Sequence, residues 1–223
     1  MIRVVNVPTP VACFVMVLAF MGMQWAVNAQ SEPPSGLIVE KNGPFTNLRV
    51  AGVEDQGKFK EIRSRPLDDA ATLKLLTDGR NELPTPYLFE LSRRLLASKP
   101  REAVRWYLIA LARLRYDAFR CTDRSVYLDG GFLLKWRQMY PEVPEWVQAN
   151  VAKEEAPKMD VRDDPELFSG TANPLYACGH GMAAIGAATR GEAVDSAKAL
   201  RPEVEWEPIR AWLAGKRPKP DFI

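Results

Sequence analysis

The stretch from Leu83 to Cys121 constrains the fold most strongly, because it has the pattern of two consecutive helices. Thr85-Pro86 places an N-cap hydroxyl before a proline at the first helical position, where the missing N–H costs no hydrogen bond. Ser98-Lys99-Pro100 ends this helix, since the residue before a proline is displaced from the α region. A second helix starts near Arg101-Glu102 after a short connection, and we therefore expect an antiparallel helical hairpin.

Apolar residues recur at helical spacing in both halves of this stretch. In the first half they are Leu88, Leu91 and Leu95, and the residues expected on the opposite face are Glu90, Arg93 and Arg94. In the second half they are Ala103, Val104, Tyr107, Leu108, Ala110, Leu111, Leu114 and Ala118. So broad an apolar face suits a helix buried on more than one side. Arg113, Arg115 and Arg120 are expected in solvent or in salt bridges.

The segment Ala103-x-x-Trp106-Tyr107-x-x-Ala110 resembles the second half of a tetratricopeptide-like repeat of the Sel type. In that family a Trp-Tyr pair and small alanines let neighbouring helices pack closely. The resemblance covers residues 85–120, and no second copy follows at a period of about 34–36 residues. It implies helix-hairpin packing and a protein-binding role, and it transfers no catalytic residue.

The N-terminus has the pattern of an export signal, which we assign to residues 1–29. Arg3 supplies the positive start, residues 11–23 are apolar, and Val27-Asn28-Ala29 places small residues at a cleavage site. The apolar run is shorter than the roughly 20 residues of a membrane span, and an uncleaved anchor is the alternative. We expect a periplasmic or secreted protein of the bacterial envelope, with no membrane span after cleavage.

Cleavage removes Cys13 and leaves Cys121 and Cys178. An even pair of cysteines in an oxidising compartment is most simply a disulfide. The alternative is two independent buried thiols. Cleavage also removes only one charge, so 29 basic and 28 acidic side chains remain. This balance gives no electrostatic basis for binding nucleic acid or an anionic membrane surface.

The remaining chain predicts a single mainly helical domain, 37–223, after a flexible leader, 30–36. Residues 37–64 are the only segment typical of β structure: 37–39 and 48–53 flank an Asn42-Gly43-Pro44 turn, and Phe59 and Ile62 fit a third strand. Further helices are expected from Asp68 to Gly79, at 132–140, from Pro144, at 190–200 and at 208–214, with a long surface loop at 157–172. The fold class is a helical bundle with a small N-terminal β hairpin or arm.

His180 is the only histidine, and it lies in Cys178-Gly179-His180-Gly181-Met182. One interpretation makes it a general base or a metal ligand. The other makes it structural, packed at a disulfide and a helix start. One histidine cannot build a histidine-rich metal site, and a cysteine held in a disulfide provides no thiolate for a nucleophile pair. We predict no metal site.

A charged cluster surrounds the other cysteine. Asp117 and Arg120 are three residues apart on the second helix and can form an ion pair, and Asp123 follows Cys121. A Cys121–Cys178 disulfide would place these groups near His180, where an acid, a base and a guanidinium could bind an anion or assist hydrolysis. The alternative is a helix end stabilised by salt bridges.

Recognisable catalytic motifs are absent from the sequence, which contains no G-x-S-x-G, no H-E-x-x-H and no phosphate loop. The acidic run Asp160-x-x-Asp163-Asp164-x-Glu166 lacks the alternating ligands of an EF-hand, so a solvated loop is expected there. No cofactor is implied. We therefore predict a non-catalytic, exported protein that binds another protein, in the manner of an inhibitor or immunity protein. The alternatives are an envelope hydrolase that uses His180 with Asp117 or Asp123, and a small-ligand-binding module.

Overall fold

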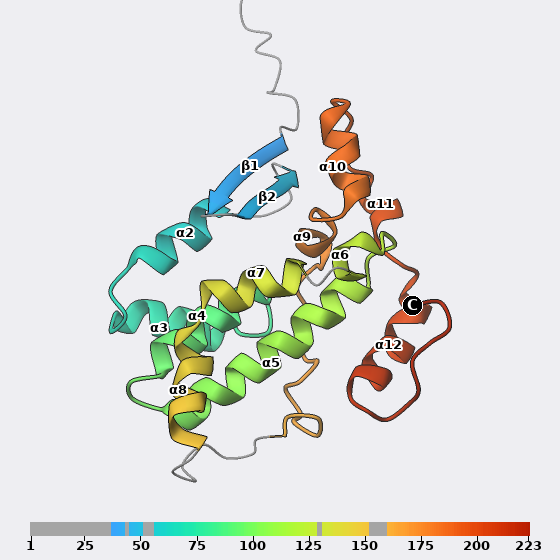
Figure 1. Ribbon diagram of the computed structural model, residues 1–223. Helices are drawn as coiled ribbons and strands as arrows, with labels where there is room; N and C mark the ends of the chain where they lie inside the picture. Colours follow the sequence, from blue (N-terminus) through green and yellow to red (C-terminus); the bar gives the residue numbers. More distant parts are fainter. Residues whose placement is uncertain (1–36, 43–44, 51–55, 129–130, 152–159) are drawn as a thin grey trace, which may run out of the picture. The chain divides into compact units, whose positions relative to one another are not determined.

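The computed structural model describes residues 37–42, 45–50, 56–128, 131–151 and 160–223, which fall within one compact unit, Ser35–Ile223 (Figure 1). The predicted signal, the leader and the hairpin turn lie outside the described residues. The described part is mainly helical, as predicted. Its helices are α2 (Gln56–Ser64), α3 (Ala70–Asp78), α4 (Pro86–Leu95), α5 (Pro100–Phe119), α6 (Ser125–Leu128), α7 (Gly131–Met139), α8 (Glu142–Val151), α9 (Leu175–Cys178), α10 (Met182–Thr189), α11 (Ser196–Ala199), the 3-10 turn η1 (Glu203–Glu205) and α12 (Trp206–Leu213).

Two strands precede these helices. Strand β1 (Leu37–Asn42) pairs antiparallel with β2 (Phe45–Val50), in a register that places Leu37 opposite Val50. The expected third strand is wrong, because Phe59 and Ile62 lie in helix α2. Their spacing of three residues places them on one helical face. Ile62 is buried, and the Phe59 ring packs edge-on against two aromatic rings of the core.

The predicted antiparallel hairpin is confirmed by the packing of α4 against α5. Near the connection the Ser92 hydroxyl donates to the carbonyl of Ala103 (2.7 Å). One turn further from the connection the Phe89 and Tyr107 rings meet with centroids 5.5 Å apart. At the far end Thr85 bonds to Asp117, so the contacts join residues ever more distant in sequence, as antiparallel helices require.

Helix α5 lies at the centre of the core and is buried on more than one side, as its broad apolar face predicts. Its Ile109 and Leu114 side chains are fully buried, and its alanines allow close approach of α4. Phe89 of α4 stacks on Trp136 of α7 and on Tyr140. Buried apolar area of this kind is the main source of stability in a helical domain.

Charged residues of α4 are also buried, although the sequence pattern places them opposite the apolar face. Glu90 is fully buried and accepts hydrogen bonds from Arg94 Nε (2.7 Å) and Arg93. The Arg94 guanidinium also donates to the carbonyls of Ile62 (2.7 Å) and Arg65 (3.2 Å), where α2 ends. A buried guanidinium thus donates to carbonyls at the end of α2, where a helix leaves acceptors without intrahelical partners or, as at Ile62, with one long backbone bond.

Several helix ends differ from the sequence expectation. Asp69, not Asp68, caps α3, because its carboxylate accepts from the N–H of Thr72. A helix over 190–200 is also wrong: α10 ends at Thr189, a turn with Gly191 at φ 72° follows, and only Ser196–Ala199 is helical again. α12 matches its predicted position and is followed by Gly215 at φ 71°. In the part of the chain that the structure describes, no helix combines the length and the apolar character needed to cross a membrane.

The predicted disulfide is confirmed in the structure: Cys121 and Cys178 are bonded, with their Cα atoms 5.4 Å apart. Cys121 follows α5 and Cys178 ends α9, and both are buried. Beside the bond, Arg201 N–H donates to the Arg120 carbonyl (2.8 Å). The disulfide joins α9 to the end of α5, and the backbone bond joins the segment after α11 to the same end of α5.

Removing the disulfide by the double change Cys121→Ala and Cys178→Ala should lower the free energy of unfolding by about 4 kcal/mol, because the bond closes a long loop in the unfolded chain. Urea denaturation with and without reductant measures this. Reductant should destabilise the wild type by a similar amount and leave the double variant unchanged. If reductant left the free energy of unfolding of the wild type unchanged, the prediction would be contradicted.

Candidate functional site

The first part of the candidate site is the Asp117 cluster, which we define as Thr85, Asp117, Arg120 and Tyr176. It forms where the end of α5 meets the start of α4 and helix α9. Asp117 is 5% exposed, and its carboxylate accepts from the Thr85 hydroxyl (2.6 Å) and from the Tyr176 hydroxyl. It also forms an ion pair with Arg120. The cluster therefore holds a buried carboxylate with three donors from three segments.

The buried charge of Asp117 determines the protonation of Tyr176 and the hydrogen bond of Thr85. Burial, and then the negative charge of Asp117, raise the pKa of Tyr176 well above its usual value, so the hydroxyl stays protonated and donates. Thr85 was expected to cap α4, but its side chain makes no capping bond and donates to Asp117 instead. The tertiary partner thus replaces the local one.

Arg120 is buried rather than exposed to solvent. Its guanidinium carbon lies 4.3 Å from the ring centroid of Tyr116 and 4.8 Å from that of Trp206. Trp206 begins α12, so the contact places the guanidinium between two helices. Cation–π attraction and the Asp117 charge both favour this buried position.

Asp123 is placed at the junction of α6 and α10. One carboxylate oxygen accepts from the N–H (2.9 Å) and the hydroxyl (2.7 Å) of Ser125, and the other accepts from the N–H of Ala183 (2.7 Å). Burial alone would raise the pKa of Asp123, but these hydrogen bonds outweigh it and lower the pKa. The Ser125 hydroxyl also accepts from the N–H of Met182 (2.8 Å). Asp123 and Ser125 therefore satisfy the N-termini of both helices.

His180 lies directly after the disulfide-bonded turn. Its ring is half-buried and packs against the Phe132 ring, with centroids 4.8 Å apart, and its backbone N–H donates to the carbonyl of Ala177. The structure brings Asp117 and Arg120 into direct contact. Asp123 instead contacts the α10 residues that follow His180.

The glycine after His180 has a packing role. A Cβ atom at Gly181 would collide with the carboxylate of Asp123 and press on Val126. A side chain there would separate α10 from Asp123, so the junction requires glycine at this position.

We expect Gly181→Ala to lower the free energy of unfolding by about 1–3 kcal/mol, the usual cost of overpacking. Gly186→Ala is the matched control within α10, where a Cβ would meet only the end of the Arg190 side chain. That change should leave stability equal or slightly higher, since alanine is the better helix former. Thermal unfolding followed by circular dichroism compares them, and equal effects of the two changes would contradict the predicted collision.

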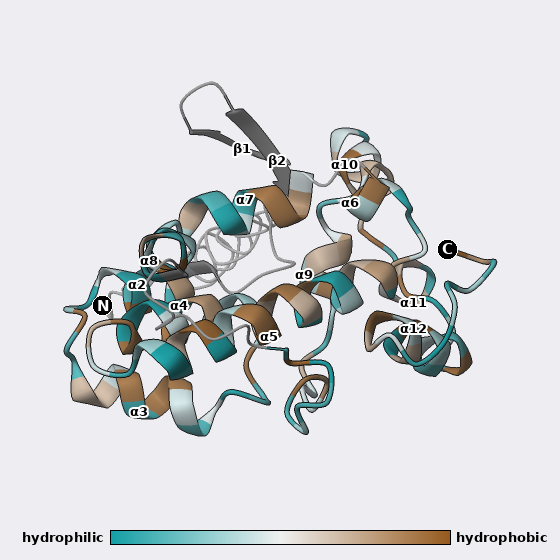
Figure 2. Cartoon of the chain, turned by 60° about the horizontal axis from the view of Figure 1, so that its bottom comes forward, coloured by the Kyte–Doolittle hydropathy of each residue, from teal (hydrophilic) through white to brown (hydrophobic). Residues whose placement is uncertain are grey.

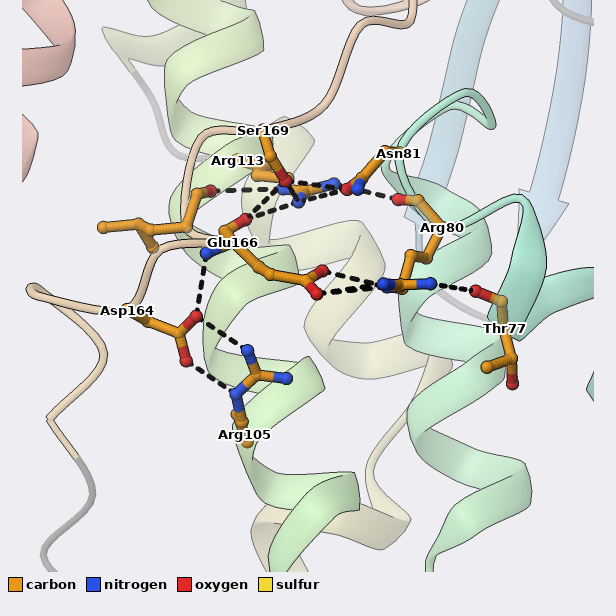
Figure 3. A network of polar contacts seen from close by, with 9 residues as sticks. Thr77, Arg80, Asn81, Arg105, Arg113, Asp164, Glu166 and Ser169 are labelled. Atoms are coloured by element: carbon orange, nitrogen blue, oxygen red, sulfur yellow. Dashed lines mark hydrogen bonds and ion pairs between the residues drawn. The ribbon is translucent and has the colours of Figure 1, made fainter.

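A second network, centred on Arg113, holds the chain from 160 to 172 against α5 (Figure 3). Arg113 is 3% exposed and donates to the carbonyls of Leu167 (3.1 Å), Arg80 (2.9 Å) and Glu166 (2.5 Å). It also donates to the side chain of Asn81 (2.8 Å). Sequence reasoning missed this role, because the acceptors lie in segments distant in sequence and the helical pattern of α5 gives no sign of them.

The acidic run is therefore not a solvated loop throughout. Asp164 forms a two-bond ion pair with Arg105 (2.6 and 2.7 Å), and Glu166 forms one with Arg80. These arginines lower the pKa of the two carboxylates, against the opposing effect of burial. Asp163 remains exposed. Among the described residues, no group of three or more ligating side chains could hold a metal ion.

Arg113→Lys keeps the positive charge but loses the planar guanidinium group, whose N–H donors reach several acceptors at once. We expect the free energy of unfolding to fall by about 2 kcal/mol or more, because buried carbonyls lose their donor. Arg115→Lys is the control, since Arg115 is exposed on the same helix, and its effect should stay within about 0.5 kcal/mol. Urea denaturation measures both, and a harmless Arg113→Lys change would contradict the network's importance.

Comparison with known proteins gives no relative: no protein-family model, no curated protein and no solved structure matches the chain. The resemblance of residues 85–120 to a Sel-type repeat stays a prediction. The geometry of the described residues is thus the basis on which a function is proposed.

Proposed function

We propose that this chain is an exported, non-catalytic helical protein that binds another protein. Three of the four candidate catalytic groups, Asp117, Arg120 and Asp123, support this view, because each of them already stabilises the fold. Asp117 and Arg120 are buried in an ion pair, and the Asp123 carboxylate accepts hydrogen bonds from two helix starts. A general base needs an accessible lone pair beside its substrate, and the buried Asp117 offers little access.

The observation that carries the proposal is an exposed apolar surface at the junction of α6 and α10. We define this α6–α10 surface as Leu128, Met182, Ala183 and Ile185. Leu128 at the end of α6 is 72% exposed, Met182 at the start of α10 is 64% exposed, and Ile185 of α10 is half-buried. Figure 2 shows apolar colouring on α10, whose eight residues include no charged side chain. The Met182 N–H donates to the Ser125 hydroxyl, which holds α10 against α6, and exposed apolar groups on adjoining helices are typical of interaction sites.

The chemistry of this surface indicates its partner. A surface without charges gains most by burying apolar side chains of another protein, because a polar partner would lose hydration without new hydrogen bonds. Methionine suits such a contact, since its flexible side chain adapts to a partner's shape. We therefore assign the surface to a protein partner that presents apolar side chains.

The disulfide and the N-terminal pattern support the export of this protein. A buried disulfide fits an oxidising compartment, which for a chain with this N-terminal pattern is the bacterial periplasm or the exterior. One concrete version is an inhibitor or immunity protein for a toxin that acts there. The hydrolase alternative, with His180 and Asp117 or Asp123, has less support because of the structural bonds that the two carboxylates already make.

The test compares two surface variants in a pull-down from periplasmic extract. The double change Leu128→Asp and Met182→Asp should abolish capture of the partner, because charge enters the apolar contact. Val204→Asp is the control: Val204 is 80% exposed, but it lies in η1 rather than in the α6–α10 surface. Binding retained by the double variant, or lost equally in the control, would contradict the proposal, provided both variants unfold at the wild-type temperature.

A further inference from the structure

A small cavity lies beside the Asp117 cluster, between the end of α5 and residues 168–172. Its wall includes Thr85, Arg113, Asp117, Arg120 and Gly170. The centre of a water-sized sphere can occupy about 10 Å³ within it, which is about the space that one water molecule needs. The lining combines donors from two guanidinium groups with hydroxyl and carboxylate oxygens.

Arg120, one of the residues that line this cavity, has a buried donor without an acceptor. The Arg120 side chain is 8% exposed, and its Nε–H is buried without a hydrogen-bond partner among the described residues. Its Nη2 atom bonds to Asp117, so the guanidinium is held in place while Nε remains unsatisfied. Buried N–H groups in folded proteins are nearly always paired with protein atoms or with ordered water.

Acceptors for a bridging molecule are present in the same wall. The Thr85 hydroxyl donates its proton to Asp117, which leaves its oxygen free to accept. The Asp117 carboxylate, with sites for about four hydrogen bonds, receives three, from Thr85, Tyr176 and Arg120. A molecule that accepts one hydrogen bond and donates two therefore matches the groups around this cavity.

We propose that this cavity binds one ordered water molecule, which accepts from Arg120 Nε–H and donates to the oxygens of Thr85 and Asp117. Water fits better than a small anion, because an anion would meet the negative charge of Asp117 and has no proton to donate. The water completes the hydrogen bonding of Arg120, whose guanidinium packs on Trp206. It thereby connects the start of α4, the end of α5 and the contact with α12.

The experiment is a set of crystal structures at about 1.2 Å resolution or better, of the wild type, Thr85→Ser and Thr85→Val. The wild type and Thr85→Ser should show a density peak within hydrogen-bond distance of Arg120 Nε and Asp117. Thr85→Val preserves the shape but removes one acceptor, and the occupancy of the peak should fall at least twofold.

A bromide soak of wild-type crystals separates water from an anion, since bromide gives an anomalous signal. The proposal requires no anomalous peak in this cavity. An anomalous peak there, a cavity without density, a protein acceptor on Arg120 Nε or a full-occupancy peak in Thr85→Val would each overturn it.

Discussion

The fold depends on charges buried along the α4–α5 hairpin, each of which holds a different neighbouring segment. Arg94 binds the end of α2, and Arg113 binds the chain around Glu166. Asp117 binds α9 through Tyr176, and Arg120 packs against the start of α12. An unpaired buried charge costs much free energy. Each neighbouring segment is therefore held in the position where it supplies the hydrogen-bond or ring partner of its buried charge. The apolar core drives the helices together, and the buried charges fix where their neighbours lie.

This arrangement also bears on function. Charged groups around a cysteine near a lone histidine are compatible with catalysis when only the sequence is known. In the folded chain Asp117 accepts hydrogen bonds from buried donors, and Asp123 accepts from the N-termini of two helices. Arg120 makes a cation–π contact with Tyr116. Among the described residues, Leu128 and Met182 are large apolar side chains that stay exposed, and the proposed function assigns them to contact with another protein. These features support the proposed binding of another protein and give less support to the alternative of a hydrolase.

Local patterns predicted the helices well wherever a boundary signal was present. Pro86 and Pro100 mark the first residues of α4 and α5, and their apolar spacing identified the core face. The strand expected at Phe59 and Ile62 was wrong, because their spacing of three residues puts them on one face of a helix but on opposite faces of a strand. They failed again at Thr85, where a tertiary acceptor replaced the local cap. The cysteine pairing was predictable because only two cysteines lie outside the predicted signal.

The sequence by itself determined the helical hairpin, the mainly helical class and the disulfide. Apolar spacing and prolines mark helices locally, and the pairing follows from the number of cysteines. Only the tertiary structure decided which arginines are buried. A helical pattern treats Arg113 and Arg115 alike as polar residues, yet one binds carbonyls of distant segments and the other faces solvent. The difference comes from acceptors more than fifty residues away along the chain, whose position no local pattern records.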